Sequence, residues 1–271
     1  MKNHQFHLVD PSPWPLLASL ATFLMCLGAV FFMHEMPIGK ILLPLGLLFI
    51  LANMFWWWRD VIKEAKKDKA HTKPVRTGLK LGMLLFIVSE VMFFFAFFFA
   101  FFHANFFPVD IFEGDWPIKE GIWPPEGIKT LDPWSIPFLN TLILLLSGTT
   151  VTWAHYALLN KQHDDLVRAL RYTVILGVIF TGFQAYEYIH ALKHYFNFTD
   201  NVYGANFYMA TGFHGFHVIV GTIFLAICYF RAKNKSFTKD NHLGFEFAAW
   251  YWHFVDAVWL FLFAVVYIWG V

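Results

Sequence analysis

Long apolar segments alternate along the chain with shorter segments that carry its charged residues. Seven of the apolar segments contain no Asp, Glu, Lys or Arg, or only one. About 20 apolar residues in a helix cross a bilayer, and a helix satisfies its own backbone hydrogen bonds in hydrocarbon. The alternation typical of a membrane β-barrel is absent from the sequence. The pattern predicts an all-α integral membrane protein, one membrane domain over residues 1–271, with seven transmembrane helices near residues 14–33, 41–58, 79–107, 137–160, 172–192, 202–230 and 247–269.

The distribution of basic residues predicts the orientation of these helices. Sixteen of the 20 Lys and Arg residues fall on the side of the N-terminus and the second, fourth and sixth loops, and four fall on the opposite side. The positive-inside rule therefore places the N-terminus inside and the C-terminus outside. The longest inner connection, Arg59 to Lys80, divides the helices into a group of two and a group of five.

Composition supports a membrane protein and excludes other classes. The chain is 58% hydrophobic and 14% charged, with a net charge of +1. Soluble domains carry about 25% charged residues, and nucleic-acid binding needs a surplus of basic ones. The sequence also lacks phosphate-binding loops and nucleophile or zinc signatures, so no catalytic centre is expected in this chain.

One acidic residue lies at the middle of a predicted membrane segment. Glu90 follows Lys80 by ten residues, which is about 15 Å along a helix. An ionisable residue at this depth costs about 2.5 to 3.5 kcal/mol and is a functional candidate. Glu90 is expected to be neutral unless water or a basic partner reaches it. It is either a proton-related group or a neutral acid that bridges two helices.

Other ionisable residues in the segments allow alternatives. Glu187 and His190 lie three residues apart, as do His253 and Asp256, and such pairs favour hydrogen bonds between helices or a role in proton handling. His214 and His217 share a helical face, which leaves metal or haem ligation as an alternative to hydrogen bonding.

The inner end of the second segment resembles a lipid-binding region. Trp58 and Arg59 end an aromatic cluster, and Glu64 and His71 follow it in the basic loop. Aromatic belts beside cations are typical of membrane interfaces, and basic clusters attract anionic headgroups. The alternative is an ordinary basic loop on the inner side.

Several long motifs, taken together, resemble the cytochrome c oxidase subunit III family, and the match runs in order along the whole chain. The motifs are Trp57-Trp-Arg-Asp-Val-Ile-Lys-Glu64, Ser89-Glu-Val-Met-Phe-Phe94, Ser147-Gly-Thr-Thr-Val-Thr-Trp-Ala-His155, Ala210-Thr-Gly-Phe-His-Gly-Phe-His217 and Ala249-Trp-Tyr-Trp-His-Phe-Val-Asp256.

The resemblance implies a subunit without a redox centre in a respiratory oxidase that reduces oxygen and translocates protons. It implies a V of two helices against five, direct packing on subunit I, and an assembly with subunit II and small accessory subunits. Haem a and copper would lie in those partner subunits, and the membrane would be a bacterial plasma membrane or the mitochondrial inner membrane.

The resemblance also implies specific roles. Phospholipids would occupy the cleft of the V, near the residues Trp58, Arg59, Glu64, His71, His217 and Arg231. Glu90 would face that cleft, and the subunit would stabilise the catalytic core and support proton uptake.

The alternative function is an independent proton-coupled transporter that uses Glu90, Glu187 and Asp256. Such a transporter predicts internal repeats, which the sequence lacks.

Overall fold

A computed structural model describes residues 11–66, 71–108, 123–125, 127–199, 201–239 and 241–270. Within these ranges the ordered elements are helices: α1 (Trp14–Met33), α2 (Gly39–Lys66), α3 (Lys73–Phe106), α4 (Ile136–Leu159), α5 (His163–His194), α6 (Val202–Lys233), α7 (Leu243–Leu262) and a π-helix, η1 (Phe263–Trp269). Seven helical spans in the described ranges are long and apolar enough to cross a membrane, the last formed by α7 with η1. The prediction of seven transmembrane helices is confirmed.

Several helices extend beyond the uncharged segments that marked them in the sequence. α2 continues to Lys66, and α5 begins at His163 with Asp164 and Asp165 in its first turn. The charged residues mark where the hydrocarbon ends, whereas the helix continues into the aqueous region. Acidic residues in a first turn are favoured there by the helix dipole.

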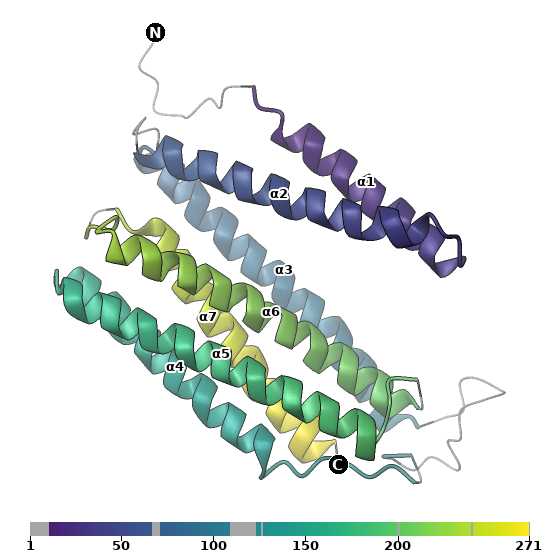
Figure 1. Ribbon diagram of the computed structural model, residues 1–271. Helices are drawn as coiled ribbons and strands as arrows, with labels where there is room; N and C mark the ends of the chain where they lie inside the picture. Colours follow the sequence, from purple (N-terminus) through teal and green to yellow (C-terminus); the bar gives the residue numbers. More distant parts are fainter. Residues whose placement is uncertain are drawn as a thin grey trace. The chain divides into compact units, whose positions relative to one another are not determined.

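The contacts between residues divide the chain into two compact units, one ending at Gly82 and the other beginning at Met83. The boundary lies inside α3. In the first unit, α1 and α2 form an antiparallel hairpin (Figure 1). A side chain at Gly28 would collide with the backbone at Leu43, so this glycine lets the two helices approach closely. The Trp14 indole donates a hydrogen bond to Asp60 at 3.0 Å and joins the start of α1 to the basic end of α2.

In the second unit, four helices form a closed bundle. α4 packs on α5, α5 on α6, α6 on α7, and α7 returns to α4. Two fully buried tryptophans of α7 donate hydrogen bonds to α4: Trp252 to Ser147 and Trp259 to Thr141, both at 2.9 Å. Buried indole N–H groups therefore have acceptors, and the bundle interior is fixed by polar as well as apolar contacts.

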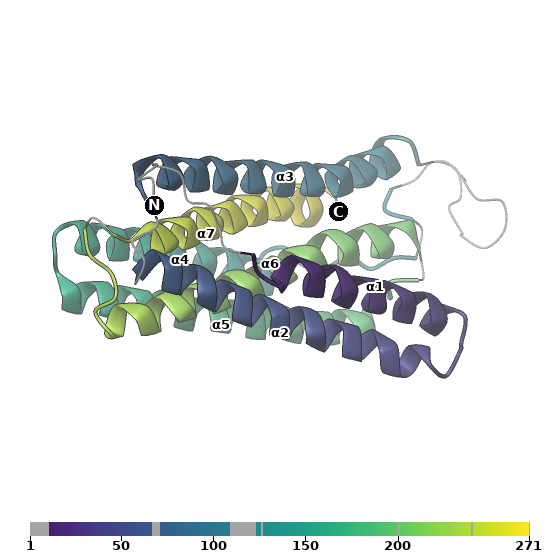
Figure 2. The same cartoon turned by 90° about the horizontal axis from the view of Figure 1, so that it is seen from above.

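The part of α3 that belongs to the second unit lies beside α7 (Figure 2). It makes its contacts through long aromatic side chains. Phe94 faces Phe254 with ring centroids 6.1 Å apart, and Phe98 meets Phe261 at 4.5 Å. Phe94, Phe98 and Phe101 are buried at helical spacing, whereas Phe95 and Phe99 are exposed. The phenylalanine-rich stretch thus has one face against protein and one outer apolar face.

Candidate functional site

Glu90 and His217 form an ion pair or hydrogen bond inside the second unit. The Glu90 Oε2 and His217 Nε2 atoms are 2.8 Å apart, and the two side chains are 21% and 9% exposed. Glu90 lies at the middle of α3 and His217 at the middle of α6. The two residues are 127 positions apart in the chain, so their pairing had no signal in the sequence. The sequence did not show whether Glu90 has a basic partner, and the structure identifies His217 as that partner.

The second nitrogen of His217 limits the proton arrangements of this pair. The Nδ1 atom lies 2.6 Å from the Phe213 carbonyl oxygen. A carbonyl oxygen only accepts hydrogen bonds, so Nδ1 carries a proton and donates it. The bond between Nε2 and Glu90 then contains one proton, held either by a neutral carboxylic acid or by an imidazolium beside a carboxylate. Both arrangements have zero net charge, which lowers the cost of placing the pair in a bilayer.

Aromatic rings surround the His217 imidazole. Its ring centroid is 5.0 Å from that of Phe94, 6.1 Å from Phe93, and 6.3 Å from both Tyr251 and Phe254. The rings come from α3 and α7, and they restrict the access of water to the Glu90–His217 bond. The environment strengthens electrostatic contacts within the pair because the local dielectric is low.

His214 has different surroundings from His217, although both lie on α6. Its Nε2 atom donates to the Val255 carbonyl oxygen at 3.0 Å, and its ring contacts those of Phe180 and Trp259. The two imidazoles that the sequence placed on one helical face therefore bond to groups on different helices. The described residues contain no group of three or more His, Cys, Asp or Glu side chains that could hold a metal ion.

Glu187 takes part in a buried network between helices. Its side chain is 2% exposed, and its Oε1 atom accepts hydrogen bonds from the Tyr267 hydroxyl at 2.7 Å and from the Gln184 amide at 3.2 Å. Asn140 of α4 donates to the same Gln184 at 3.4 Å. The sequence had indicated His190 as the neighbour of Glu187 on one face. The structure instead gives Glu187 an interhelical bond to η1, because its side chain points into the bundle.

Asp256 and His253 lie at the contact between α7 and α4. The Nε2 atom of His253 is 3.2 Å from the Thr152 hydroxyl. The Asp256 Oδ2 atom lies 2.7 Å from the point that a Cβ atom at Gly148 would occupy. Within the described residues, Asp256 Oδ1 is buried without a hydrogen-bond partner. A side chain at Gly148 would displace this carboxyl group.

The residues predicted to bind lipid fall into both units. Trp58 is 63% exposed, the Arg59 guanidinium lies 4.6 Å above the Trp56 ring, and Glu64 and His71 are half-buried, all in the first unit. Arg231 is half-buried in the second unit, with its guanidinium 4.6 Å above Phe237.

His217 and Arg231 are also separated along α6. Their positions differ by 14 residues, which is about 21 Å along a helix. One headgroup therefore does not contact both. The structure brings His217 to Glu90, whereas Arg231 lies in the last turn of α6.

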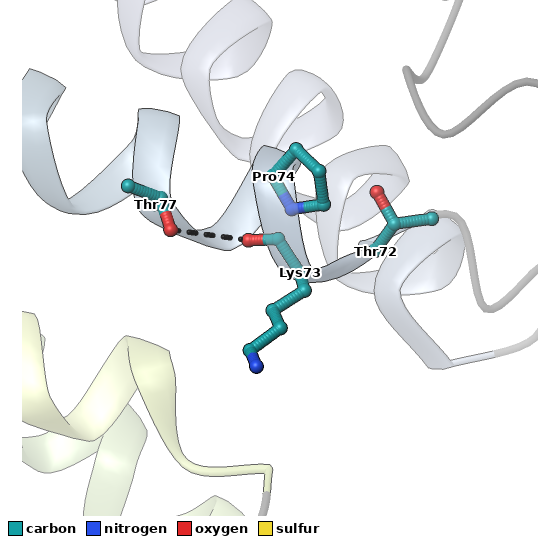
Figure 3. A pocket seen from close by; sticks show the side chains of 4 residues that line it. All are labelled: Thr72, Lys73, Pro74 and Thr77. Atoms are coloured by element: carbon teal, nitrogen blue, oxygen red, sulfur yellow. Dashed lines mark hydrogen bonds between the residues drawn. The ribbon is translucent and has the colours of Figure 1, made fainter.

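A shallow cavity of about 490 Å³ lies at the first turn of α3, close to His71 in the chain. It is lined by Thr72, Lys73, Pro74 and Thr77, and the Thr77 hydroxyl donates to the Lys73 carbonyl oxygen at 3.2 Å (Figure 3). No motif in the sequence indicated this group.

Comparisons with known proteins cover the whole chain. A family model described as cytochrome c oxidase subunit III matches residues 4–271. A probable cytochrome c oxidase subunit 3 of Rickettsia felis is 58% identical over 271 residues, which are 99% of this chain and 96% of the relative. The cytochrome c oxidase subunit 3 of Arabidopsis thaliana is 56% identical over 270 residues, 99% of this chain and 98% of the relative. That of Prototheca wickerhamii is also 56% identical, over 100% of this chain and 99% of the relative.

Proposed function

Because the chain belongs to the cytochrome c oxidase subunit III family, we propose that it supports proton uptake, holds phospholipids and stabilises the catalytic core of the oxidase. The chain is a membrane-embedded subunit of the oxidase complex, and we expect it to carry no cofactor of its own. Haem a and copper are then supplied by partner subunits, which carry out the reduction of oxygen.

The Glu90–His217 bond is the observation that carries the proton-related part of this proposal. The pair holds one proton between two atoms 2.8 Å apart, and the proton can move between them without changing the net charge. The pair is therefore suited to storing a proton during turnover and returning it to an inner proton-conducting group.

The lipid-related part is supported by the exposed surfaces of the first unit. In the most apolar stretch of each of the helices α1 and α2, only 11% of the residues are buried inside the molecule. Acyl chains fit these surfaces, and the exposed Trp58 and Arg59 at the end of α2 are suited to an interfacial headgroup. The family resemblance extends the proposed phospholipid contacts to four further residues: Glu64, His71, His217 and Arg231.

Contact with subunit I is supported by polar groups at bilayer depth on α7 and α4. Asp256 lies 13 residues from the start of α7, about 20 Å along the helix, beside the exposed His253 and Thr152. Such groups are costly against lipid, so a protein surface that supplies hydrogen-bond partners is favoured there. Subunit II and small accessory subunits complete the proposed complex.

The proposed location is a bacterial plasma membrane or the mitochondrial inner membrane. The relatives come from both bacteria and organisms with mitochondria. The excess of basic residues on one side favours an inner N-terminus and an outer C-terminus.

Purification through a tag on this chain tests the proposal. We expect haem a absorption to accompany the chain, together with a larger copper-binding subunit identified by mass spectrometry. Proton uptake is then compared in the assembled wild-type complex and the Glu90→Gln complex. A colourless chain without partners would contradict the assembly, and equal proton uptake in both complexes would contradict the role of Glu90.

A further inference from the structure

Two histidines lie one helical turn apart near the C-terminal end of α5. The ring centroids of His190 and His194 are 4.9 Å apart, with an angle of 51° between the ring planes. Residues at positions i and i+4 of a helix share one face, so the two imidazoles converge on the same side. His190 is half-buried and His194 is exposed. Among the described residues, both rings have aromatic contacts and neither has a hydrogen-bond partner.

The separation of the rings fits two ligands of one metal ion. A zinc ion lies about 2.1 Å from a ligating imidazole nitrogen and hence about 3.2 Å from the ring centroid. Two such rings would have centroids about 4.5 Å apart for a right-angled site and about 5.2 Å apart for a tetrahedral one. The observed 4.9 Å lies between these values. Neighbouring rings also limit the motion of His190, since Tyr186 stacks on it at 6.2 Å and Tyr195 lies 5.5 Å away.

The position along the helix gives hydrated ions access to both rings. α5 has 32 residues and is therefore about 48 Å long, compared with a hydrocarbon core of about 30 Å. The charged residues of the first nine positions place most of the excess at the start of the helix, and the apolar segment 172–192 is followed directly by Lys193. His190 lies in the last turn of that segment and His194 just beyond it, at the membrane–water interface.

We propose that His190 and His194 form a surface site for a divalent transition-metal ion that imidazole prefers, with Zn²⁺ as the representative ion. Two imidazoles supply two coordination positions, and water completes the shell. This site differs from a redox centre and is independent of the function proposed for Glu90. The distribution of basic residues predicts that it lies on the outer side of the membrane.

Zinc binding to the purified oxidase complex tests the site. The complex containing the full chain is dialysed against increasing Zn²⁺, and bound zinc is measured by mass spectrometry for wild type, His190→Ala and His194→Ala. We expect each variant to bind zinc at this site at least about tenfold more weakly than the wild type, because one imidazole alone cannot chelate the ion. His103→Ala, an exposed histidine at the end of α3, is the matched control and should bind as wild type does.

A second variant separates chelation from the mere number of histidines. Leu192→His combined with His194→Leu keeps the composition but places the second imidazole at i+2, where it does not face His190. We expect this variant to bind zinc as weakly as His194→Ala. Binding isotherms that are the same for wild type, the single variants and this variant would overturn the site. An equal loss in His103→Ala would overturn it as well.

Discussion

Replacing His217 with Leu is expected to destabilise the subunit, because it leaves the Glu90 carboxyl group without its partner in the middle of the membrane. The atoms involved are 2.8 Å apart, a distance typical of a charge-assisted hydrogen bond. Loss of such a bond costs about 1.5 to 3 kcal/mol. The 21% exposure of Glu90 allows some solvation, so we expect this range and not the larger penalty of a fully buried unpaired charge.

The Glu90→Gln variant should cost less. The Gln amide can donate to Nε2 of a neutral His217, whose Nδ1–H remains bonded to the Phe213 carbonyl group. The bond is kept, so we expect a loss below about 1 kcal/mol and an intact complex. The double variant Glu90→Leu with His217→Leu removes both polar groups, and replacement of a buried polar pair by apolar residues is often nearly neutral.

The assay is the temperature at which this chain dissociates from the purified complex, detected by separating the subunits after heating. We expect the midpoint for His217→Leu to be lower than that of the wild type, as a loss of about 1.5 to 3 kcal/mol implies. Glu90→Gln and the double variant should remain near wild type. Proton uptake should decrease in the double variant nonetheless, since it is stable and lacks the group that holds the proton.

Additive losses of stability in the single variants would contradict an interaction between Glu90 and His217. If the double variant loses as much stability as the sum of Glu90→Leu and His217→Leu, the two side chains do not interact. A His217→Leu complex with the wild-type midpoint would show that the bond contributes nothing to stability.

Three further predictions concern other contacts. Gly148→Ala should lower the dissociation midpoint, because the added Cβ atom would lie 2.7 Å from Asp256 Oδ2. Gly182→Ala is the control: no atom lies within 4 Å of its added Cβ, so the midpoint should be unchanged or higher. Equal effects of the two variants would contradict the close contact at Gly148. Tyr267→Phe removes the 2.7 Å hydrogen bond to Glu187 and should cost about 1 to 3 kcal/mol, seen as a lower midpoint than in the exposed control Tyr156→Phe. Arg59→Ala and Arg231→Ala should lower the phospholipid content of the complex by mass spectrometry, with Lys161→Ala as an exposed basic control; unchanged content would argue against headgroup binding.

The helices were predictable from sequence because hydrocarbon leaves a chain few alternatives. A span of uncharged apolar residues must bond its own backbone, so each of the seven spans could be recognised without reference to the others. Helix ends were less predictable. The first turn of α5, with Asp164 and Asp165, lies where water satisfies charged side chains, and hydropathy there does not distinguish helix from loop.

The sequence identified Glu90 as a candidate, but it did not indicate that Glu90 pairs with His217. Glu90 could be identified by itself because a carboxyl group at bilayer depth is costly and rare. His217 had several equivalent interpretations, as a lipid contact, a metal ligand or a helix-bridging group. Its pairing with Glu90 depends on the packing of α3 against α6, 127 positions away, which no local pattern encodes.

Local hydropathy was thus sufficient to identify the class of protein, its seven spans and the acidic residues that require an explanation. The packing of the helices set the contacts of those residues: Glu90 bonds His217, Glu187 bonds Tyr267, and Asp256 lies close to Gly148. The free energy of transferring a residue into a bilayer is a sum of local contributions, whereas a hydrogen bond between helices depends on the rotation and register of both helices. Those quantities are set by the packing of all the helices in the bundle together.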